Sequence, residues 1–442
     1  MIRPLLLLSL VTLSQASIAG TDTVLEVRAR EISKMVAAEP TIDPAIFDKT
    51  LLKQLPITKL APIFAGFFEK HGSATGVILK GRDSEFSGRF ELSLEREVVM
   101  PMSLTLAAQP PHAVIGLWFG APSVPLKDFD AVVAELAKLP GRTGFECREL
   151  GVENTPVIAA RNAEETFAIG SSFKLYVLGA LAQAVETGRR KLGDVIQLTP
   201  ATRSLPSGRM HTWPAGSPVT LHTLAVAMIS ESDNTATDTL MQTLTRAACE
   251  AILEPMHNTS IAQNKPFLTT GEMFKLKLTN GGKWADAYLE RDELGRRKLL
   301  ANELAQIELR PADLELQLLA SPSHIDTIEW FASPRDMVAA MDALRTATEP
   351  GKQAAGLREV LSVNPGLPAM KDVFEWVGFK GGSETGVLNA TFLLRARNGR
   401  TFALSAAWND PQAALDEERF FAIVGRAGQL LARHAAAEAT SK

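Results

Sequence analysis

Residues 170–186 read GSSFKLYVLGALAQAVE, and this stretch decides what kind of domain the chain forms. Apolar side chains occupy every face of a helix built from it, and a helix that is apolar all round is a buried one. Lys174 is the one charge between Glu165 and Glu186. Because burial penalises an ammonium, we expect the pKa of Lys174 to fall and its amine to become a usable base.

Ser171 comes three positions before Lys174, which places both side chains on one helical face within hydrogen-bonding range. The unpaired N–H groups at a helix N-terminus also favour developing negative charge. A hydroxyl beside a neutral amine is the arrangement of an activated serine nucleophile. The alternative is an ordinary helix with a surface lysine, since Ser and Lys at this spacing occur about once by chance in a chain this long.

Ser232-Asp233-Asn234 follows 61 positions after Ser171, between two helical patterns. One interpretation is a helix cap, because Ser, Asp and Asn are all favoured at that position. The functional interpretation makes Ser232 a proton shuttle to the leaving group. In that interpretation Asn234 is an amide contact to the substrate.

Lys380-Gly381-Gly382-Ser383 follows a strand-like segment, 374–379. Two glycines in a strand indicate a bulge or the close approach of another backbone, and here they would let a substrate lie along an edge strand. The N–H of Ser383 could then join that of Ser171 in binding an acyl oxyanion. The alternative is a glycine turn after the strand.

In this order, S-x-x-K, S-D-N and K-G-G resemble the penicillin-recognising serine hydrolases, most closely the class A β-lactamases. The resemblance covers residues 128–442 and includes Ser333-Pro334, expected as a helix cap and first helical residue. It implies a fold with an antiparallel sheet and a helical subdomain. It also implies a nucleophile with its base, two proton-transfer or electrostatic partners and a substrate-binding set: Ser171, Lys174, Ser232 and Lys380 as catalytic residues, and Asn234, Ser207, Gly382 and Ser383 as substrate-binding residues.

The sequence departs from the class A pattern at two points. The interval between Ser232 and Lys380 contains a charged, helix-like insertion at about 271–319, and no E-x-x-x-N motif precedes Ser333. Without a glutamate to activate water, hydrolysis of an acyl-enzyme should be slow. Gly381 also replaces a hydroxyl residue that helps bind the β-lactam carboxylate, so we expect ester or amide acyl transfer on another substrate. Five glutamates of the interval lack the matching context: Glu272, Glu303, Glu308, Glu315 and Glu329.

The sequence before residue 120 has a different pattern of predicted elements. Two amphipathic helices, 23–38 and 58–71, are followed by four short strand-like runs, which predicts a small α+β domain over 20–120. The runs are 75–80, 88–96, 101–108 and 112–119. This domain is expected to be of cyclase or isomerase type (NTF2/cystatin-like), and the layout is similar to that of the esterase-like protein of the clavulanic acid biosynthetic cluster. Leu205-Pro206-Ser207-Gly208 also resembles that subfamily, which is the basis for including Ser207.

Residues 121–127 are predicted to be a proline-containing linker and 128–442 the hydrolase-like domain. That domain should begin with a helix over 128–139 and a strand over 143–150. Late strands over 391–397 and 401–408 flank Asn398-Gly399, a signal for a two-residue hairpin turn. A helix over 413–437 closes the chain. Strands at both ends of the domain predict a sheet in which the terminal segments pair around a helical middle.

Residues 1–19 have the features of a secretory signal peptide, so we expect a periplasmic or secreted bacterial protein without a stable membrane span after cleavage. The 442 residues carry 46 basic and 50 acidic side chains, a balance that argues against nucleic acid as partner. The seven histidines are scattered, and no metal or cofactor is expected. Cys147 and Cys249 are interpreted as buried thiols in preference to a disulfide.

Three functions fit these observations. The first is a serine hydrolase acting on a small-molecule β-lactam or a related ester through an acyl-Ser171 intermediate. The second is a penicillin-binding-protein-like peptidase or acyltransferase acting on cell-wall peptides. The third is a ligand-binding protein without turnover.

Overall fold

The computed structural model describes residues 23–120, 122–152, 157–308 and 320–437. The expected signal peptide, residue 121 of the linker and Glu315 lie outside the described residues. The chain divides into two compact units, residues 1–122 and 123–442. Each unit has its own apolar core, one in the first and two large ones in the second.

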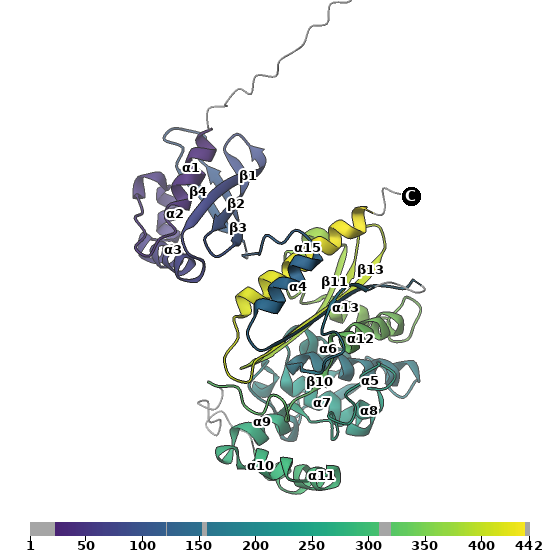
Figure 1. Ribbon diagram of the computed structural model, residues 1–442. Coiled ribbons are helices and arrows are strands. Elements are labelled where there is room, and N and C mark those ends of the chain that lie inside the picture. Colours follow the sequence, from purple (N-terminus) through teal and green to yellow (C-terminus); the bar gives the residue numbers. More distant parts are fainter. Residues whose placement is uncertain (1–22, 121, 153–156, 309–319, 438–442) are drawn as a thin grey trace, which may run out of the picture. The chain divides into compact units, whose positions relative to one another are not determined.

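The first unit contains a four-stranded antiparallel meander packed against helices (Figure 1). Thr23 caps the first helix, and its capping box with Glu26 satisfies two of the N–H groups that are free at the helix start. The predicted helices and strands are present, although the first helix ends at Ser33 and not at residue 38, and η1 and α2 were not predicted. Whether this unit is of cyclase or isomerase type stays a prediction. Its elements are α1 (Val24–Ser33), η1 (Pro44–Ile46), α2 (Lys49–Gln54), α3 (Ile57–His71), β1 (Ala74–Ser84), β2 (Ser87–Leu94), β3 (Val98–Leu106) and β4 (Val114–Phe119).

The second unit is built on a five-stranded antiparallel sheet with the order β11-β12-β13-β5-β6. The first strand of the unit pairs with the last, so Cys147 lies opposite Leu404. The prediction that terminal segments pair around a helical middle is therefore confirmed. The strands are β5 (Arg142–Leu150), β6 (Val157–Arg161), β11 (Trp376–Glu384), β12 (Val387–Arg395) and β13 (Thr401–Asn409).

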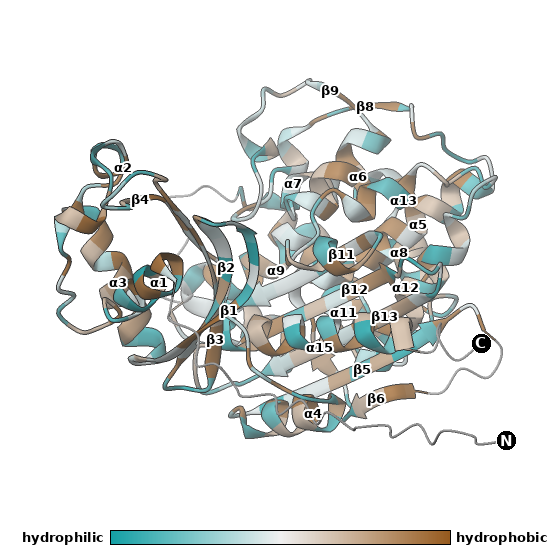
Figure 2. Cartoon of the chain, turned by 90° about the horizontal axis from the view of Figure 1, so that it is seen from above, coloured by the Kyte–Doolittle hydropathy of each residue, from teal (hydrophilic) through white to brown (hydrophobic). Residues whose placement is uncertain are grey.

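Helices cover both faces of this sheet (Figure 1). On one face, α4 (Phe129–Lys138) and α15 (Glu417–Ala437) pack against Phe145 and Phe402. On the other face, Leu393 and Ala403 join the core of the helical subdomain. Apolar residues run along α6 in Figure 2, as expected of a helix surrounded by protein. The subdomain helices are α5 (Lys174–Glu186), α6 (Leu221–Ser230), α7 (Asn234–Leu244), α8 (Arg246–Ala251), α9 (Thr270–Leu278), α10 (Lys283–Leu289), α11 (Glu293–Asn302), α12 (Pro334–Ala347), α13 (Leu357–Ser362) and α14 (Met370–Val373).

Short elements connect these layers. The pair β7 (Phe167–Ala168) and β10 (Phe331–Ala332) joins the segment before residue 170 to the segment before α12. Ser333 caps α12 and Pro334 is its first residue, as predicted. The remaining short elements are η2 (Gly170–Phe173), β8 (Val195–Gln197), η3 (Pro200–Thr202), η4 (Met210–Thr212), β9 (Pro218–Thr220), η5 (Asn280–Gly282) and η6 (Leu304–Gln306).

The predicted two-residue turn at Asn398-Gly399 is wrong, although the hairpin itself is present. Arg395 pairs with Thr401, and the N–H of Ala396 donates to the carbonyl of Arg400 at 2.8 Å, so three residues form the loop. A two-residue type I′ turn needs positive φ at both central positions. Gly399 has φ +85°, whereas Asn398 does not adopt positive φ.

Both cysteines are free and buried, which confirms the thiol interpretation. Cys147 lies on β5 and Cys249 on α8. Within the described ranges, no helix combines the length and the apolar character that a bilayer crossing requires.

Candidate active site

Lys174 is the first residue of α5 and is fully buried, as the apolar pattern of the helix predicts. Its Nζ donates to the backbone oxygen of Ser232 at 2.6 Å and to the Oδ1 of Asn234 at 2.7 Å, and it lies 3.0 Å from the Oγ of Ser232. A neutral amine has two N–H groups and one lone pair, so two donated bonds and a contact with the Ser232 hydroxyl occupy all three of its hydrogen-bonding positions. The predicted hydrogen bond between Ser171 and Lys174 is accordingly not found among the described residues, although Ser171 lies in the turn η2 immediately before α5.

Two lysines near this site lose their charge more readily than exposed lysines do. Burial lowers the pKa of Lys174 well below its usual value of 10.5, and the positive charge of Lys380 lowers it further. Asp238 and Asp233 act in the opposite direction. Burial also lowers the pKa of Lys380 to about 7, and its Nζ donates to the backbone oxygen of Gly381. An amine with a lowered pKa has a free lone pair near neutral pH, which a base requires.

The turn that carries Ser171 is in close contact with edge strand β11. A Cβ on Gly382 would overlap the carbonyl oxygen of Ile169 and would lie 2.7 Å from the backbone nitrogen of Ser171. A Cβ on Gly170 would lie 3.0 Å from the backbone nitrogen of Ser383. The pairing of β11 is regular, so the close-approach interpretation of the glycines is right and the bulge is wrong. The chain that approaches Gly382 is the Ser171 turn, which brings the N–H groups of Ser171 and Ser383 to the same place.

The S-D-N segment combines the two interpretations that the sequence left open. Asp233 caps α7 by accepting from the N–H of Ala236 at 2.8 Å. Ser232, at φ +55°, turns the chain so that both its oxygens reach Lys174. Asn234 donates from Nδ2 to the backbone oxygen of Leu205 at 2.9 Å and accepts from Lys174, so both ends of its amide are already paired. A substrate contact by Asn234 stays a prediction.

A cavity of about 340 Å³ lies over these residues. Five of the predicted residues line it, whereas Lys174, Lys380 and Gly382 lie behind its wall. A larger cavity of about 720 Å³ contains none of the predicted residues. The smaller cavity is lined by Gly170, Ser171, Pro206, Ser207, Ser232, Asn234, Thr270, Met273, Phe274, Glu329, Trp330, Gly381, Ser383 and Glu384.

Sequence reasoning missed a buried ionic cluster in the wall of this cavity. Lys277 on α9 contacts Glu384 at 2.7 Å and Glu329 at 3.5 Å. Burial, followed by the charge of Glu384, raises the pKa of Glu329 to about 8. Trp330 stacks on Phe173 at 3.7 Å between ring centroids, and this packing places Glu329 beside the Ser171 turn. The available signals were a lysine between two leucines in α9 and a glutamate four positions before Ser333.

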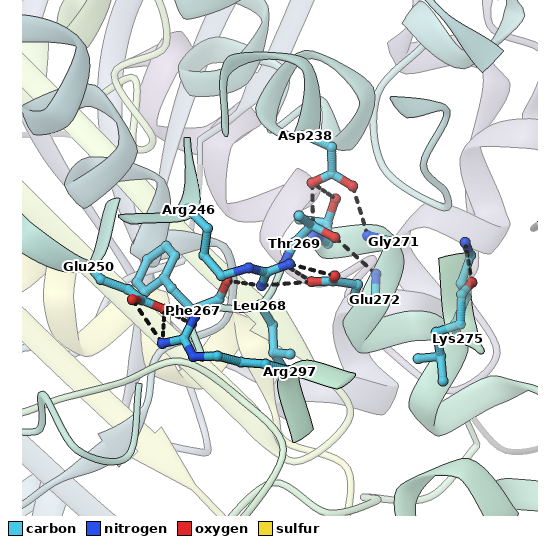
Figure 3. Close-up of polar contacts among 12 residues, drawn as sticks. Asp238, Arg246, Glu250, Phe267, Leu268, Thr269, Gly271, Glu272, Lys275 and Arg297 are labelled. Carbon is cyan, nitrogen blue, oxygen red and sulfur yellow. Dashed lines mark hydrogen bonds and ion pairs between the residues drawn. The ribbon is translucent and has the colours of Figure 1, made fainter. Parts of the chain in front are cut away.

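The insertion is held against α7 by a second polar network (Figure 3). The carboxylate of Asp238 accepts from the N–H groups of Thr270 and Gly271, both at 2.8 Å. Arg246 forms two hydrogen bonds with Glu272, at 2.6 and 3.0 Å. Because Thr270, Met273 and Phe274 line the cavity, this network fixes one of its walls. Glu272 therefore has a structural partner, and Glu303 and Glu308 are exposed away from the Ser171 cavity.

Comparisons with known proteins relate the chain to one family. Residues 127–434 match the model of the Beta-lactamase enzyme family, a range that includes every predicted site residue. No curated protein matches the chain. A solved beta-lactamase from Sphaerobacter thermophilus DSM 20745 is 20% identical, with coverage of 69% of this chain and 97% of that one and a TM-score of 0.47. A beta-lactamase from Chitinophaga pinensis DSM 2588 is 16% identical, with coverage of 69% of this chain and 98% of that one and a TM-score of 0.48. A beta-lactamase from Francisella tularensis is 14% identical, with coverage of 70% of this chain and 99% of that one and a TM-score of 0.47.

Proposed function

The chain belongs to the beta-lactamase enzyme family, and on that premise we propose that it is an exported serine hydrolase that forms an acyl-enzyme on Ser171. The observation that carries the proposal is the buried Lys174 amine, bonded to Ser232 and Asn234 behind a cavity that Ser171 lines. A neutral amine is the base that a serine nucleophile needs. The apolar run in residues 5–13 supports export.

In the proposed reaction the Oγ of Ser171 attacks the carbonyl carbon of an ester or amide. Its proton passes to the Nζ of Lys174 once that amine has released its contact with the Oγ of Ser232, and the N–H groups of Ser171 and Ser383 stabilise the oxyanion. The bond to the leaving oxygen or nitrogen then breaks, and that atom takes the proton from Lys174 through the hydroxyl of Ser232. Addition of water to the acyl-Ser171 ester releases the acid and restores the serine.

We favour an ester or an amide other than penicillin as the substrate. The chain lacks the E-x-x-x-N motif before Ser333, and Gly381 stands where the family has a hydroxyl residue. Glu329 lies in the cavity wall, but its raised pKa means that most of it is protonated at neutral pH and is a poor base for water. A peptidase or acyltransferase of penicillin-binding-protein type shares the acylation step and differs in the lifetime of the adduct.

Incubation with a fluorescent penicillin and with an activated nitrophenyl ester, followed by intact-protein mass spectrometry, tests the proposal. We expect acylation of Ser171 and none in Ser171→Ala. Lys174→Ala should slow acylation by about 10²–10⁴, the usual size of a general-base effect. The exposed Lys191→Ala serves as the control and should acylate at the wild-type rate.

The lifetime of the adduct separates the candidate functions. Rapid turnover of the penicillin indicates a β-lactamase, and a lasting penicillin adduct indicates a peptidase or acyltransferase. An adduct with the ester alone supports the esterase-like function. Absence of any adduct with both probes would refute the enzyme proposal and leave a binding protein.

A further inference from the structure

The cavity over Ser171 carries an unusual set of charges. Among the described residues that line it, the charged ones are Glu329 and Glu384, and both are acidic. The cations nearest the nucleophile, Lys174 and Lys380, are buried behind the wall and have lowered pKa values. A substrate carboxylate would therefore meet two glutamates and no lining arginine or lysine within the described ranges.

The internal ion pairs leave this wall with one excess acidic group. Lys277 is buried between the two carboxylates, and although burial lowers its pKa, the charges of Glu384 and Glu329 outweigh burial and raise it. One ammonium balances one carboxylate, and the second glutamate, Glu329, avoids an uncompensated charge at neutral pH by keeping its proton. Holding a buried carboxylate without its own counter-ion is costly, and a cation entering the cavity would remove that cost.

The same wall offers apolar and aromatic surface next to the carboxylates. Met273, Phe274 and Trp330 line the cavity together with Glu329 and Glu384. Aromatic rings beside carboxylates are a combination that binds ammonium groups, because both ring faces and anions attract positive charge. Two of these residues belong to α9, so the insertion that distinguishes this chain also builds the wall.

We propose that the acyl donor attacked by Ser171 carries an ammonium group, which is bound by Glu384 and by Glu329, the latter releasing its proton to solvent as the cation binds. This inference rests on the acyl transfer proposed above and specifies its substrate class as cationic esters or amides. Glu329 and Glu384 are specificity residues, and the reaction itself uses Ser171 and Lys174.

Three matched nitrophenyl esters test the inference without any variant. One acyl chain ends in a trimethylammonium group, the second in an isosteric tert-butyl group and the third in a carboxylate. Acylation rates are measured by nitrophenolate release and checked by intact-protein mass spectrometry. We expect the cationic ester to acylate Ser171 faster than its neutral isostere, on the order of tenfold, and the anionic ester to be slowest.

Two variants assign the preference to the cluster. Glu384→Gln should bring the ratio of cationic to neutral rates close to one, and Glu384→Asp should restore part of it. Glu290→Gln removes an exposed carboxylate of the same subdomain and should keep the wild-type ratio. The ratio is informative because a merely structural role of Glu384 would lower both rates together.

Equal rates for the cationic and neutral esters in the wild-type protein would overturn the inference and leave the acyl transfer standing. Faster acylation of Ser171 by the anionic ester than by the neutral ester would overturn the inference in the same way. A preference that persists in Glu384→Gln would remove Glu384 from the proposed role. If no ester acylates Ser171, both the proposed function and this inference fail.

Discussion

Glu329 keeps its proton to a higher pH in the folded chain than an exposed glutamate does. Its pKa rises from an ordinary 4.5 to about 8 because its side chain is buried and faces Glu384. Lys277, which contacts it, keeps its charge because its own pKa is raised. His324 is also affected by this cluster, and burial followed by Lys277 lowers its pKa.

The free energy of unfolding should reflect this titration. Between pH 4.5 and about 8, the unfolded chain ionises Glu329 while the folded chain keeps it protonated. The folded chain then binds more protons, so stability falls as pH rises, by up to about 1.4 kcal/mol per pH unit. Glu329→Gln cannot ionise, so we expect its stability relative to wild type to increase across this window in urea unfolding.

The exposed Glu303→Gln is the control for this titration and should follow the wild-type pH profile. Parallel profiles of wild type and Glu329→Gln would show that the carboxyl does not titrate in this window. A variant that is more stable than wild type at alkaline pH would mean that the native glutamate reduces stability. Such a residue in a cavity wall is characteristic of a binding role.

At the scale of elements, the contact between β11 and η2 sets the position of the nucleophile. Gly382→Ala would force its Cβ against the backbone of Ile169 and Ser171, which cannot move without shifting the turn. We expect a loss of about 1–3 kcal/mol in the free energy of unfolding and a marked fall in the acylation rate. Both are measured on purified protein, by urea unfolding and mass spectrometry.

The neighbouring glycine provides the matched comparison. A Cβ on Gly381 would meet the far end of the Phe379 ring at 2.8 Å, and a side chain can rotate away more easily than a backbone. Gly381→Ala should therefore be the milder change in both measurements. Equal effects of the two substitutions would argue against the backbone contact as the feature that positions Ser171.

Elements whose signals are local could be predicted from the sequence. The apolar residues on every face of α5 predicted the burial of Lys174, and the capping residues of α12 predicted its start at Pro334. The hairpin was predicted but the length of its loop was not, because the choice between a two-residue and a three-residue loop depends on the φ of Asn398. Dihedral angles of this kind are set by the flanking strands as well as by residue type.

The ionic cluster could not be predicted because its members are brought together by tertiary packing. Lys277 is 52 positions from Glu329 and 107 from Glu384. Each residue taken alone has an ordinary alternative as a surface charge. The pairing of β10 with β7 puts Glu329 next to the nucleophile, and both strands are too short to show a pattern.

At the scale of the whole molecule, the candidate site and both large cores of the second unit lie within residues 123–442. The core of the first unit is made entirely of residues 25–114. We therefore expect residues 123–442, expressed alone, to fold cooperatively and to acylate at Ser171 as the full chain does. Circular dichroism melting and ester acylation check this expectation. Failure to fold would show that the first unit is required for the stability of the second.

The two thiols have a practical consequence. Cys147 and Cys249 are the chain's two cysteines, and both are shielded inside apolar cores, where burial raises the pKa of Cys249 to about 12 and also raises that of Cys147. The thiols of the native protein should therefore not react with maleimide dyes, and reductant should not change its stability. A single cysteine introduced at the rim of the cavity would then be the one site that a fluorophore labels, and a change in its fluorescence would measure ligand binding.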